Sequence, residues 1–402
     1  MFRLVPPAGT AVKVSQVLRA LKAACTSNGR SERTLKALGE QVHVPHVFAL
    51  SSGRAALWAI LKALHHLRPE RDVVAVPAYT CFSVPASIVR AGLRVFPVDV
   101  DPETLDFDFA QLALLPEKQL LCIVTSHLFG LVNDVSRIRQ IARAKGAFVV
   151  DDAAQALGAS REGRLAGTCG DVGFYSLGRG KPLACAEGGL IVTDSEEIAS
   201  ALQVEAEVLP PSPLPHSAWV FLQTLAYSLF LHPRLYWIPH SLPFLKLGTT
   251  EYDPGFPITA LARFPAAFLS LQMDRLSELN EIRRKNGTAI SRALAGNPHF
   301  AAPRPADGCL PTYIRFPVMA QDGPTRDRAV ARLRAACISA SPFYPGAVCD
   351  IETIGRHMAI RDFHRPKAEE VSRRLLTLPT HEYVTDQDLE TIVNTLRSVP
   401  EE

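Results

Sequence analysis

The chain has 402 residues, enough for two domains with substantial cores, and 47% of them are hydrophobic while 21% are charged. This balance is typical of a globular protein and excludes a chain that is disordered throughout. The formal net charge is only +3 and the basic residues are scattered among acidic ones, so no stripe of positive charge indicates a nucleic-acid-binding surface.

Between residues 46 and 193 short β-branched segments alternate with helical patterns. A helix is predicted after the first strand, because Leu57, Ile60, Leu61 and Leu64 recur at helical spacing. Few polar residues lie on either face of the strands, which is typical of parallel strands covered on both sides. The pattern predicts an α/β fold with a mainly parallel central sheet flanked by helices. The predicted strands are 46–50, 72–77, 94–100, 120–125, 147–151 and 171–174.

After about residue 195 the pattern changes. A long helix is predicted at 264–294 and short strands are predicted around 312–320. A closing helix is expected after Thr385, which forms a capping pattern with Asp388. We therefore predict two domains, a large α/β domain at 1–255 with an N-terminal arm and a smaller C-terminal α+β domain at 256–402.

A proline-rich apolar insert at 205–255 ends the predicted large domain. It contains an apolar run at 218–231 that only Gln223, Thr224 and Ser228 interrupt. The run is too short to span a bilayer, which takes roughly 20 residues. A buried helix, a subunit contact or a lid is one interpretation, and a helix lying in a membrane interface is the other.

The composition indicates neither export nor a metal site. Prolines interrupt the first residues of the chain, where a signal peptide needs an unbroken apolar run. The cysteines form no CxxC pair and no cysteine–histidine ligand spacing, so neither a metal site nor a disulfide framework is predicted. We expect a cytoplasmic protein with reduced thiols, whose one candidate for membrane contact is the run at 218–231.

Three polar segments follow predicted strands, with the sequences SSGR (51–54), DDAAQA (151–156) and YSLGRGK (175–181). Ligands of open α/β sheets bind beyond the carboxyl ends of the strands, where these segments would meet. The first can hold a phosphate at a helix N-terminus, the second supplies a buried carboxylate, and the third supplies a hydroxyl and the amine of Lys181. Lys181 does not belong to a P-loop, because Pro182 stands where that motif needs a serine or threonine.

Together these groups fit pyridoxal phosphate. A carboxylate beside the pyridine nitrogen favours the protonated nitrogen on which the chemistry of this cofactor depends. The cofactor's aldehyde needs a lysine for a Schiff base, and its phosphate needs N–H and hydroxyl donors. Each group alone has a structural alternative, such as a solvated lysine, a helix cap or a turn, so the order of the three segments carries the prediction.

With the three polar segments in this order, the chain resembles the DegT/StrS-type sugar aminotransferases, which are fold-type I pyridoxal phosphate enzymes. The resemblance rests on runs such as FALSSGRAAL, VVDDAAQALGA and GDVGFYSLGRGKPLACAEGGLIVTD, and it covers most of the chain outside 200–255. It implies transfer of an amino group from an amino acid, glutamate, to a keto sugar that is nucleotide-linked, in glycan or secondary-metabolite biosynthesis. It also implies a homodimer whose active sites lie at the subunit interface.

The resemblance also assigns cofactor contacts. It makes Lys181 the catalytic lysine, which forms the Schiff base and carries protons. It places Asp152 at the pyridine nitrogen and Gln155 beside the phenolic oxygen of the cofactor. Ser176 and Gly53 are expected at the phosphate.

Three further residues are implied as substrate contacts, and each has a structural alternative. His127 is otherwise a polar residue at a strand end, and Arg263 is otherwise part of a surface ion pair. Tyr344 lies in the run PFYP, which otherwise shapes a loop.

The chain departs from the family pattern at several positions. Arg54 stands where the family commonly has threonine in the phosphate loop, and Leu261 stands where an asparagine is expected two residues before Arg263. Cys81, followed by Phe82, occupies the position of an aromatic residue that stacks on the cofactor ring. We hypothesise that Arg54 supplies the phosphate contact that the missing threonine and asparagine would have given.

Two other functions stay open at this point. A pyridoxal phosphate sugar dehydratase shares the fold, but that branch typically has histidine in place of the lysine. Lys181 therefore disfavours a dehydratase. A cofactor-binding regulator or scaffold without turnover is the second alternative, because the phosphate loop is altered and Cys81 replaces an aromatic residue.

Overall fold

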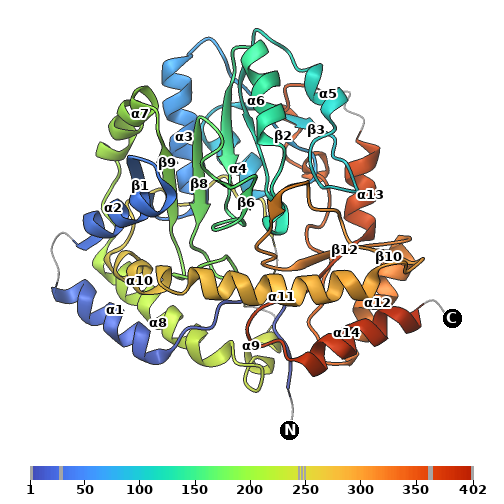
Figure 1. The fold of residues 1–402 in the computed structure, drawn as a ribbon. Coiled ribbons are helices and arrows are strands. Elements are labelled where there is room, and N and C mark those ends of the chain that lie inside the picture. The colour runs from blue at the N-terminus through green and yellow to red at the C-terminus, as the bar shows by residue number, and fades with distance from the viewer. Residues whose placement is uncertain are drawn as a thin grey trace.

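The computed structural model describes residues 3–26, 30–242, 245, 248, 250–360 and 365–399. Its centre is a seven-stranded sheet with the strand order β1-β9-β8-β5-β4-β2-β3 (Figure 1). Neighbouring strands from β8 to β3 are parallel, and β9 alone runs against its neighbours, β8 and β1. The predicted α/β fold with a mainly parallel sheet is confirmed. The strands of this sheet are β1 (His46–Leu50), β2 (Val73–Pro77), β3 (Arg94–Val98), β4 (Leu120–Val124), β5 (Phe148–Asp152), β8 (Val172–Ser176) and β9 (Gly189–Thr193).

The remaining elements surround this sheet. The α-helices are α1 (Val14–Thr26), α2 (Arg30–Val42), α3 (Gly53–Leu67), α4 (Ser83–Arg90), α5 (Phe109–Ala113), α6 (Val135–Ala144), α7 (Glu196–Glu207), α8 (Leu214–Phe230), α9 (Trp237–His240), α10 (Arg263–Met273), α11 (Leu276–Leu294), α12 (Gly323–Ala335), α13 (Pro366–Arg374) and α14 (Asp386–Ser398). Short 3-10 turns are η1 (Leu128–Gly130), η3 (Val348–Asp350) and η4 (Gly355–His357). The minor strands are β6 (Ser160–Arg161), β7 (Arg164–Leu165), β10 (Phe300–Ala301), β11 (Cys309–Leu310), β12 (Phe316–Ala320) and β13 (Leu375–Leu378).

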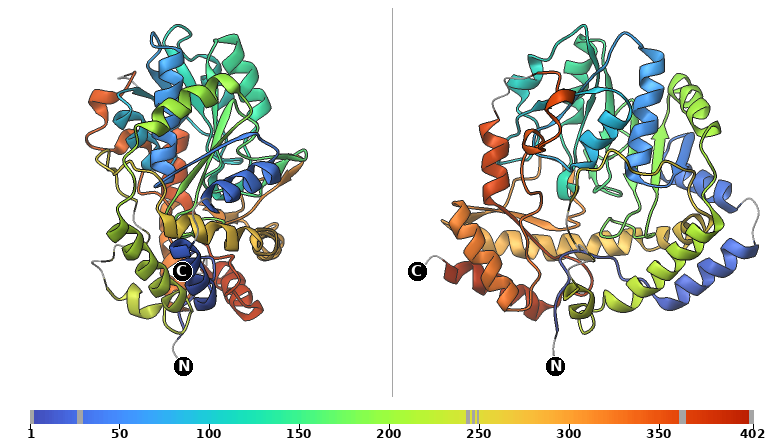
Figure 2. Two further views of the ribbon diagram at one scale, coloured as in Figure 1. Left: turned by 90° about the vertical axis from the view of Figure 1, so that its left-hand side faces the viewer. Right: turned by 180° about the vertical axis from the view of Figure 1, so that it is seen from behind.

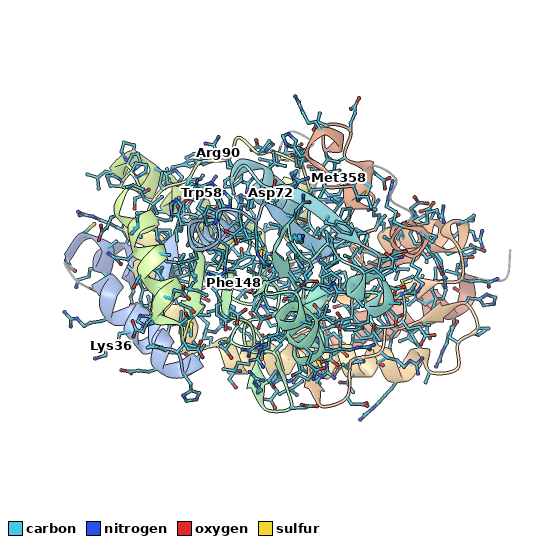
Figure 3. The ribbon with its side chains drawn as sticks, turned by 90° about the horizontal axis from the view of Figure 1, so that it is seen from above. Lys36, Trp58, Asp72, Arg90, Phe148 and Met358 are labelled. Atoms are coloured by element: carbon cyan, nitrogen blue, oxygen red, sulfur yellow. The ribbon has the colours of Figure 1, made fainter. Side chains whose placement is uncertain are left out.

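Helices cover both faces of the large sheet. Neighbouring residues of a strand point to opposite sides, so each strand contributes side chains to a core on each face. On β2, Val74 and Val76 pack in the core shared with α3, α4 and α7. Val73 and Ala75 of the same strand pack in a second core with α5 and α6. In Figure 3 Lys36 lies at the end of the molecule where α2 packs against β1, and Met358, whose backbone pairs with Val95, lies beside β3 at the opposite edge of the large sheet.

The C-terminal part contains a smaller antiparallel sheet with the strand order β10-β12-β13. Helix α14 begins with the predicted cap. The Oγ1 atom of Thr385 accepts a hydrogen bond from the backbone N–H of Asp388 (3.2 Å), and the Asp388 carboxylate accepts one from the backbone N–H of Thr385 (2.7 Å). The predicted closing helix is therefore confirmed, since both of these amide groups find partners at its first turn.

The prediction of one long helix at 264–294 is wrong, because the structure has two helices, α10 and α11, separated at Asp274 and Arg275. The guanidinium of Arg275 donates to the backbone oxygen of Ala11 (2.7 Å) and to the carboxylate of Glu382 (3.0 Å). The break lets α10 pack on α1, α2 and α8, while α11 runs towards α14 (Figure 1). Packing of α10 thus crosses the predicted domain boundary at 255/256, and the division into two domains stays a prediction.

The apolar insert forms α8 and α9, and α8 lies against α1 and α10 along the lower end of the molecule (Figure 2). Of the residues of α8, only Val220 and Thr224 are buried, so this helix is covered on one side only. Among the helices in the described ranges, none is both long and apolar enough to cross a membrane.

Candidate functional site

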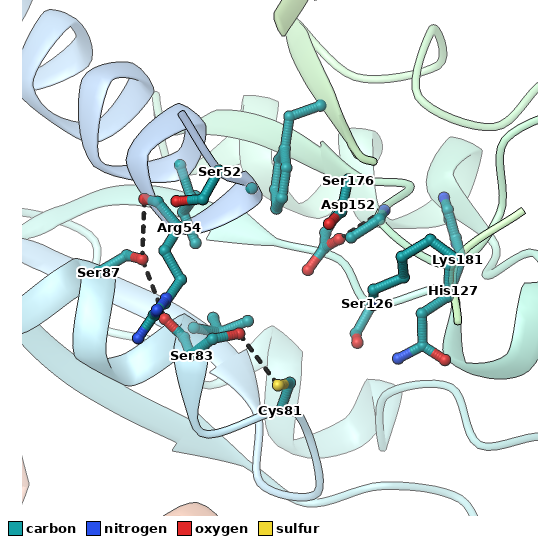
Figure 4. Close-up of a pocket in the computed structure, with 16 residues that line it drawn as sticks. Ser52, Arg54, Cys81, Ser83, Ser87, Ser126, His127, Asp152, Ser176 and Lys181 are labelled. Carbon is teal, nitrogen blue, oxygen red and sulfur yellow. Dashed lines mark hydrogen bonds between the residues drawn. The ribbon is translucent and has the colours of Figure 1, made fainter. Parts of the chain in front are cut away.

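A pocket of about 220 Å³ lies where the N-terminus of α3 meets the carboxyl ends of β5 and β8 (Figure 4). Segments that are far apart in sequence form its walls, as expected for the ligand site of an open α/β sheet. Most of the candidate residues line it. They are Gly53, Arg54, Cys81, His127, Asp152, Gln155, Ser176 and Lys181.

Asp152 is the last residue of β5, and its side chain is only 7% exposed. Its Oδ1 atom accepts a hydrogen bond from the backbone N–H of Ala154 (2.9 Å), which holds the carboxylate at the strand end. Burial raises the pKa of Asp152 to about 6, although the hydrogen bond from Ala154 and the positive charge of Lys181 oppose that shift. A buried carboxylate of this kind gains most when a cationic group binds beside it.

Lys181 follows β8 in a tight loop. Gly180 just before it adopts a positive φ of 78°, which glycine allows at little cost, and the Lys181 N–H donates to the Gly178 oxygen (3.2 Å). Burial lowers the pKa of the Lys181 ammonium, although Cys81 and Asp152 act in the opposite direction. A lowered pKa enlarges the fraction of neutral amine, which is the form that attacks an aldehyde.

Gly53 is the first residue of α3 and lies against Ser176. A Cβ atom at Gly53 would stand 3.1 Å from the Ser176 Cβ and 3.3 Å from its Oγ, so a larger residue would crowd this hydroxyl. The helix begins here because the Ser52 side chain accepts a hydrogen bond from the backbone N–H of Ala55 (3.1 Å). A helix N-terminus beside a serine hydroxyl is a favourable place for a phosphate.

Arg54 adds a positive charge to this end of the pocket. Its guanidinium lies 4.9 Å from the ring centre of Phe256, and one of its nitrogens is 3.7 Å from a carboxylate oxygen of Asp253. Asp253 is more than half exposed, so this ion pair is weak and does not bind the arginine firmly. The Arg54 side chain is therefore available to a bound anion.

Gln155 and Tyr344 form a contact that crosses the molecule. The Gln155 side chain donates to the Tyr344 hydroxyl (2.9 Å) and accepts from the backbone N–H of Phe129 (3.0 Å). The Tyr344 ring packs against the Tyr79 ring, with 5.4 Å between their centres. Tyr344 does not line the pocket itself, but it orients Gln155, which does.

His127 is held by the protein at both ring nitrogens. Its Nε2 lies 2.5 Å from Oδ1 of the buried Asp151, and its Nδ1 accepts a hydrogen bond from the backbone N–H of Asn133 (3.0 Å). Asp151 also accepts from the backbone N–H groups of Gly167 and Cys169, and although burial raises its pKa, these bonds and His127 lower it overall. The imidazole therefore carries its proton on Nε2, and only its ring surface is free to face a ligand.

Comparison with known proteins identifies the family. Residues 8–207 and 254–397 match the DegT/DnrJ/EryC1/StrS aminotransferase family. The chain belongs to this family. A GDP-perosamine synthase from Caulobacter vibrioides is 26% identical over 370 residues, covering 90% of this chain and 88% of that protein. A pleiotropic regulatory protein from Geobacillus stearothermophilus is 26% identical over 325 residues, covering 80% of this chain and 77% of that protein.

Solved structures share the fold of this DegT/DnrJ/EryC1/StrS aminotransferase. PseC from Helicobacter pylori, an aminotransferase involved in pseudoaminic acid biosynthesis, matches with a TM-score of 0.80 at 14% identity and covers 99% of each chain. A GDP-4-keto-6-deoxy-D-mannose-3-dehydratase from E. coli matches with a TM-score of 0.78 at 19% identity, covering 98% of this chain and all of that one. The fold therefore does not separate amino transfer from dehydration.

The predicted family, enzyme class and cofactor are confirmed. The protein is an aminotransferase that depends on pyridoxal phosphate. Its pocket suits this cofactor, because one end offers a helix N-terminus, a serine hydroxyl and an arginine, while the other holds a buried carboxylate and an amine. When bound, the cofactor supplies the electron sink and the carbon that receives the amino group.

Besides Tyr344, two predicted contact residues lie outside the pocket of their own chain, Phe82 and Arg263. Phe82 is 8% exposed and packs in the core between α3 and α4, because the turn into α4 directs Cys81 and Ser83 to the pocket and the residue between them away from it. Arg263 is exposed at the first residue of α10.

Phe174 lines the aminotransferase pocket but was not among the residues predicted from the sequence. A signal for it existed, because Phe174 and Ser176 are two residues apart on β8 and therefore share one face of the strand. Ser52, Ser83, Ser87, Ser126 and Ala154 also line the pocket and were missed.

Proposed function

We propose that this aminotransferase transfers an amino group from glutamate to the keto carbon of a nucleotide-linked sugar, in glycan or secondary-metabolite biosynthesis. The single observation that carries the proposal is the meeting of Lys181, Asp152 and Ser176 in one pocket of a chain with this family's fold. The name of one relative, GDP-perosamine synthase, supports a nucleotide-linked sugar as acceptor. In the overall reaction the C–N bond of the donor breaks and water supplies the oxygen of the 2-oxo acid, while the keto oxygen of the sugar leaves as water and a C–N bond forms in its place.

The residues would divide the work as follows. Lys181 would hold the aldehyde end of the cofactor between turnovers and, as a free amine during turnover, its Nζ would accept the proton of the donor's α carbon. Asp152 keeps the pyridine nitrogen protonated. Ser176, Gly53 and Arg54 hold the phosphate. The same steps in reverse on the acceptor complete the reaction.

Both alternatives from the sequence are less well supported. A dehydratase is disfavoured because position 181, where that branch typically has histidine, is a lysine that lines the pocket together with Asp152. A regulator without turnover has one point in its favour, since a relative bears the name pleiotropic regulatory protein. The buried carboxylate of Asp152 and the lowered pKa of the Lys181 ammonium favour catalysis, because neither is needed merely to hold a phosphate.

We also propose a homodimer in which Arg263 of one copy contacts the substrate bound to the other. This arrangement would reconcile the resemblance, which implies a substrate contact, with the exposed position of Arg263 outside its own pocket. Light scattering would give the mass in solution. Mixing inactive Lys181→Ala and Arg263→Ala chains should restore part of the activity, and the absence of any recovery would contradict a shared site.

A cytoplasmic location, with the run at 218–231 as its membrane contact, belongs to the same proposal. All eight cysteines are free thiols, which suits a reducing compartment. Cell fractionation would test it, and recovery of the protein from an extracellular fraction would contradict it.

The proposed reaction is tested with the purified holoenzyme, L-glutamate and a panel of nucleotide-linked keto sugars. We expect release of 2-oxoglutarate that requires one of the sugars, together with an aminated sugar detected by mass spectrometry. If glutamate alone converts the cofactor but no sugar restores it, the acceptor class is wrong. If glutamate changes nothing and glutamine or another amino acid does, the donor is wrong.

Arg54→Ala is expected to weaken binding of pyridoxal phosphate to the cofactor-free protein by roughly tenfold, because a charge-assisted contact to the phosphate is lost. Titration followed by absorbance measures the dissociation constant. Arg68→Ala, at the other end of α3 and outside the pocket, is the matched control and should bind normally. An unchanged affinity of Arg54→Ala would show that this side chain does not replace the family's usual contacts.

A further inference from the structure

The outer face of α8 is apolar along its whole length. Its exposed residues Ala218, Trp219, Leu222, Ala226 and Leu229 recur at steps of three and four, so they form one continuous stripe on the helix. Trp219 is 57% exposed, Leu222 is 52% exposed and Leu229 is 45% exposed. A helix on the surface of a globular protein normally has polar side chains on this face, so the stripe needs an explanation.

The stripe continues beyond α8. The chain that follows it exposes Leu235 (40%), Trp237 (43%) and Leu242 (38%). Leu18 of α1, the helix that packs beside α8, is 52% exposed. Figures 1 and 2 place α1, α8 and α9 together along the lower end of the molecule. We call the exposed apolar side chains of this region the apolar face; its large members are Leu18, Trp219, Leu222, Leu229, Leu235, Trp237 and Leu242.

The segments that carry the apolar face contain basic residues and no acidic ones. From residue 209 to residue 250 the sequence contains no aspartate or glutamate, while it contains Arg234 and Lys246. Helix α1 likewise has no acidic residue, and its Arg19 and Lys22 are exposed beside Leu18. Basic charges on the segments that carry the apolar side chains match a surface that is apolar inside and negatively charged outside.

The insert is also separate from what the family shares. Residues 208–253 fall between the two matched segments of the chain, so α8 and α9 lie in a part that the family model does not match, whereas α1 lies in a matched part. Two of the three tryptophans of the protein lie in this part. Tryptophan is the residue type that most favours the boundary between lipid headgroups and acyl chains.

We propose that α8, α9 and the adjoining side of α1 form a surface that binds an anionic lipid bilayer. Trp219, Leu222 and Leu229 enter the boundary between headgroups and acyl chains, and α8 lies in the plane of the membrane. Arg19, Lys22 and Arg234 contact the headgroup phosphates. This surface is independent of the proposed acceptor and donor, because none of these residues lines the pocket.

The experiment is co-sedimentation of the full-length holoenzyme with vesicles of phosphatidylcholine alone or of phosphatidylcholine mixed with phosphatidylglycerol. We expect binding to the mixed vesicles that is at least roughly tenfold tighter than to the neutral ones and that weakens with added salt. The double variant Trp219→Gln/Leu222→Gln should lose binding by roughly tenfold or more. Leu114→Gln replaces a leucine that is 82% exposed elsewhere and should bind as the wild type does.

Glutamate-dependent activity and melting temperature, measured without vesicles, show whether each variant is folded, since the replaced residues lie outside the pocket. The triple variant Arg19→Gln/Lys22→Gln/Arg234→Gln should lose the preference for phosphatidylglycerol. The proposal is overturned if the wild type does not bind mixed vesicles or if the folded double variant binds them equally well. It is also overturned if the wild type does not bind vesicles and light scattering shows a larger assembly for the wild type than for the double variant. The apolar face would then contact a second copy of the chain.

Discussion

Lys181→Ala is expected to lower the rate of amino transfer by a factor on the order of a thousand or more, because it removes both the attacking amine and the proton carrier from the pocket. Among the described residues that line the pocket, Lys181 is the only lysine, so no other primary amine stands ready to replace it. Burial lowers the pKa of Lys181, so a larger fraction of this amine is neutral and able to react than would be the case for an exposed lysine.

Visible absorbance is the first measurement. The wild type should show the band of lysine-bound cofactor, which glutamate removes, and Lys181→Ala should lack that band while still binding pyridoxal phosphate at its phosphate end. Lys36→Ala changes an exposed lysine of α2 and should behave as the wild type. If Lys181→Ala kept both the band and the turnover, another residue would be the catalytic lysine, and absence of the band from the wild type would support the scaffold alternative.

Asp152→Asn is expected to lower kcat by a factor on the order of a hundred to ten thousand, because a neutral amide no longer favours the protonated pyridine nitrogen. Affinity for the phosphate end should change far less, since Asp152 lies at the other end of the pocket. Steady-state kinetics with glutamate, combined with a cofactor titration, separate the two effects. A kcat close to that of the wild type would remove Asp152 from the proposed mechanism.

Asp152→Asn should lower kcat, but at neutral pH it should raise the stability of the cofactor-free protein. Burial raises the pKa of Asp152 from 3.8 to about 6, so the folded state holds this proton more tightly than the unfolded state does. Stability contributed by the protonated form is therefore complete below about pH 4 and is lost as the pH rises through 6. At pH 7 Asp152→Asn should be more stable than the wild type by up to about 3 kcal/mol, and the difference should vanish near pH 4.

Urea unfolding of the cofactor-free proteins at both pH values measures this difference. Asp106→Asn is a matched control, because burial also raises the pKa of Asp106 to about 6 but this residue lies outside the pocket. It should change the pH dependence of stability without the loss of kcat. Equal pH dependence in the wild type and Asp152→Asn would mean that the carboxylate is not buried as described.

Much of the fold was predictable because it depends on neighbours in the sequence. Strands that are apolar on both faces indicate a sheet covered by helices, and Thr385 with Asp388 marks a helix start through bonds that span three residues. Lys181, Asp152 and Ser176 were identified in the same way, since they lie in the segments 151–156 and 175–181 that follow predicted strands, and parallel strands end at one edge.

Other features depend on contacts between distant segments, which no local pattern encodes. The Gln155 amide meets the Tyr344 hydroxyl across 189 positions of the chain. The break between α10 and α11 is supported by bonds from Arg275 to Ala11 and Glu382, which lie near opposite ends of the sequence. A helical pattern of apolar residues continues through this break, so it could not be seen in the sequence.

Residue types at strand ends were enough to identify the cofactor, because its aldehyde, pyridine nitrogen and phosphate each need one kind of side chain. Which of these side chains reach the pocket was decided by the tertiary structure. In the tertiary structure Phe82 packs in the core and Phe174 lines the pocket. Both ring nitrogens of His127 are hydrogen-bonded, one to Asp151 and the other to Asn133. The tertiary structure also left one side of α8 uncovered. Composition sets the chemistry that a chain can perform, whereas burial, which depends on every neighbour in space, decides which groups are free to perform it.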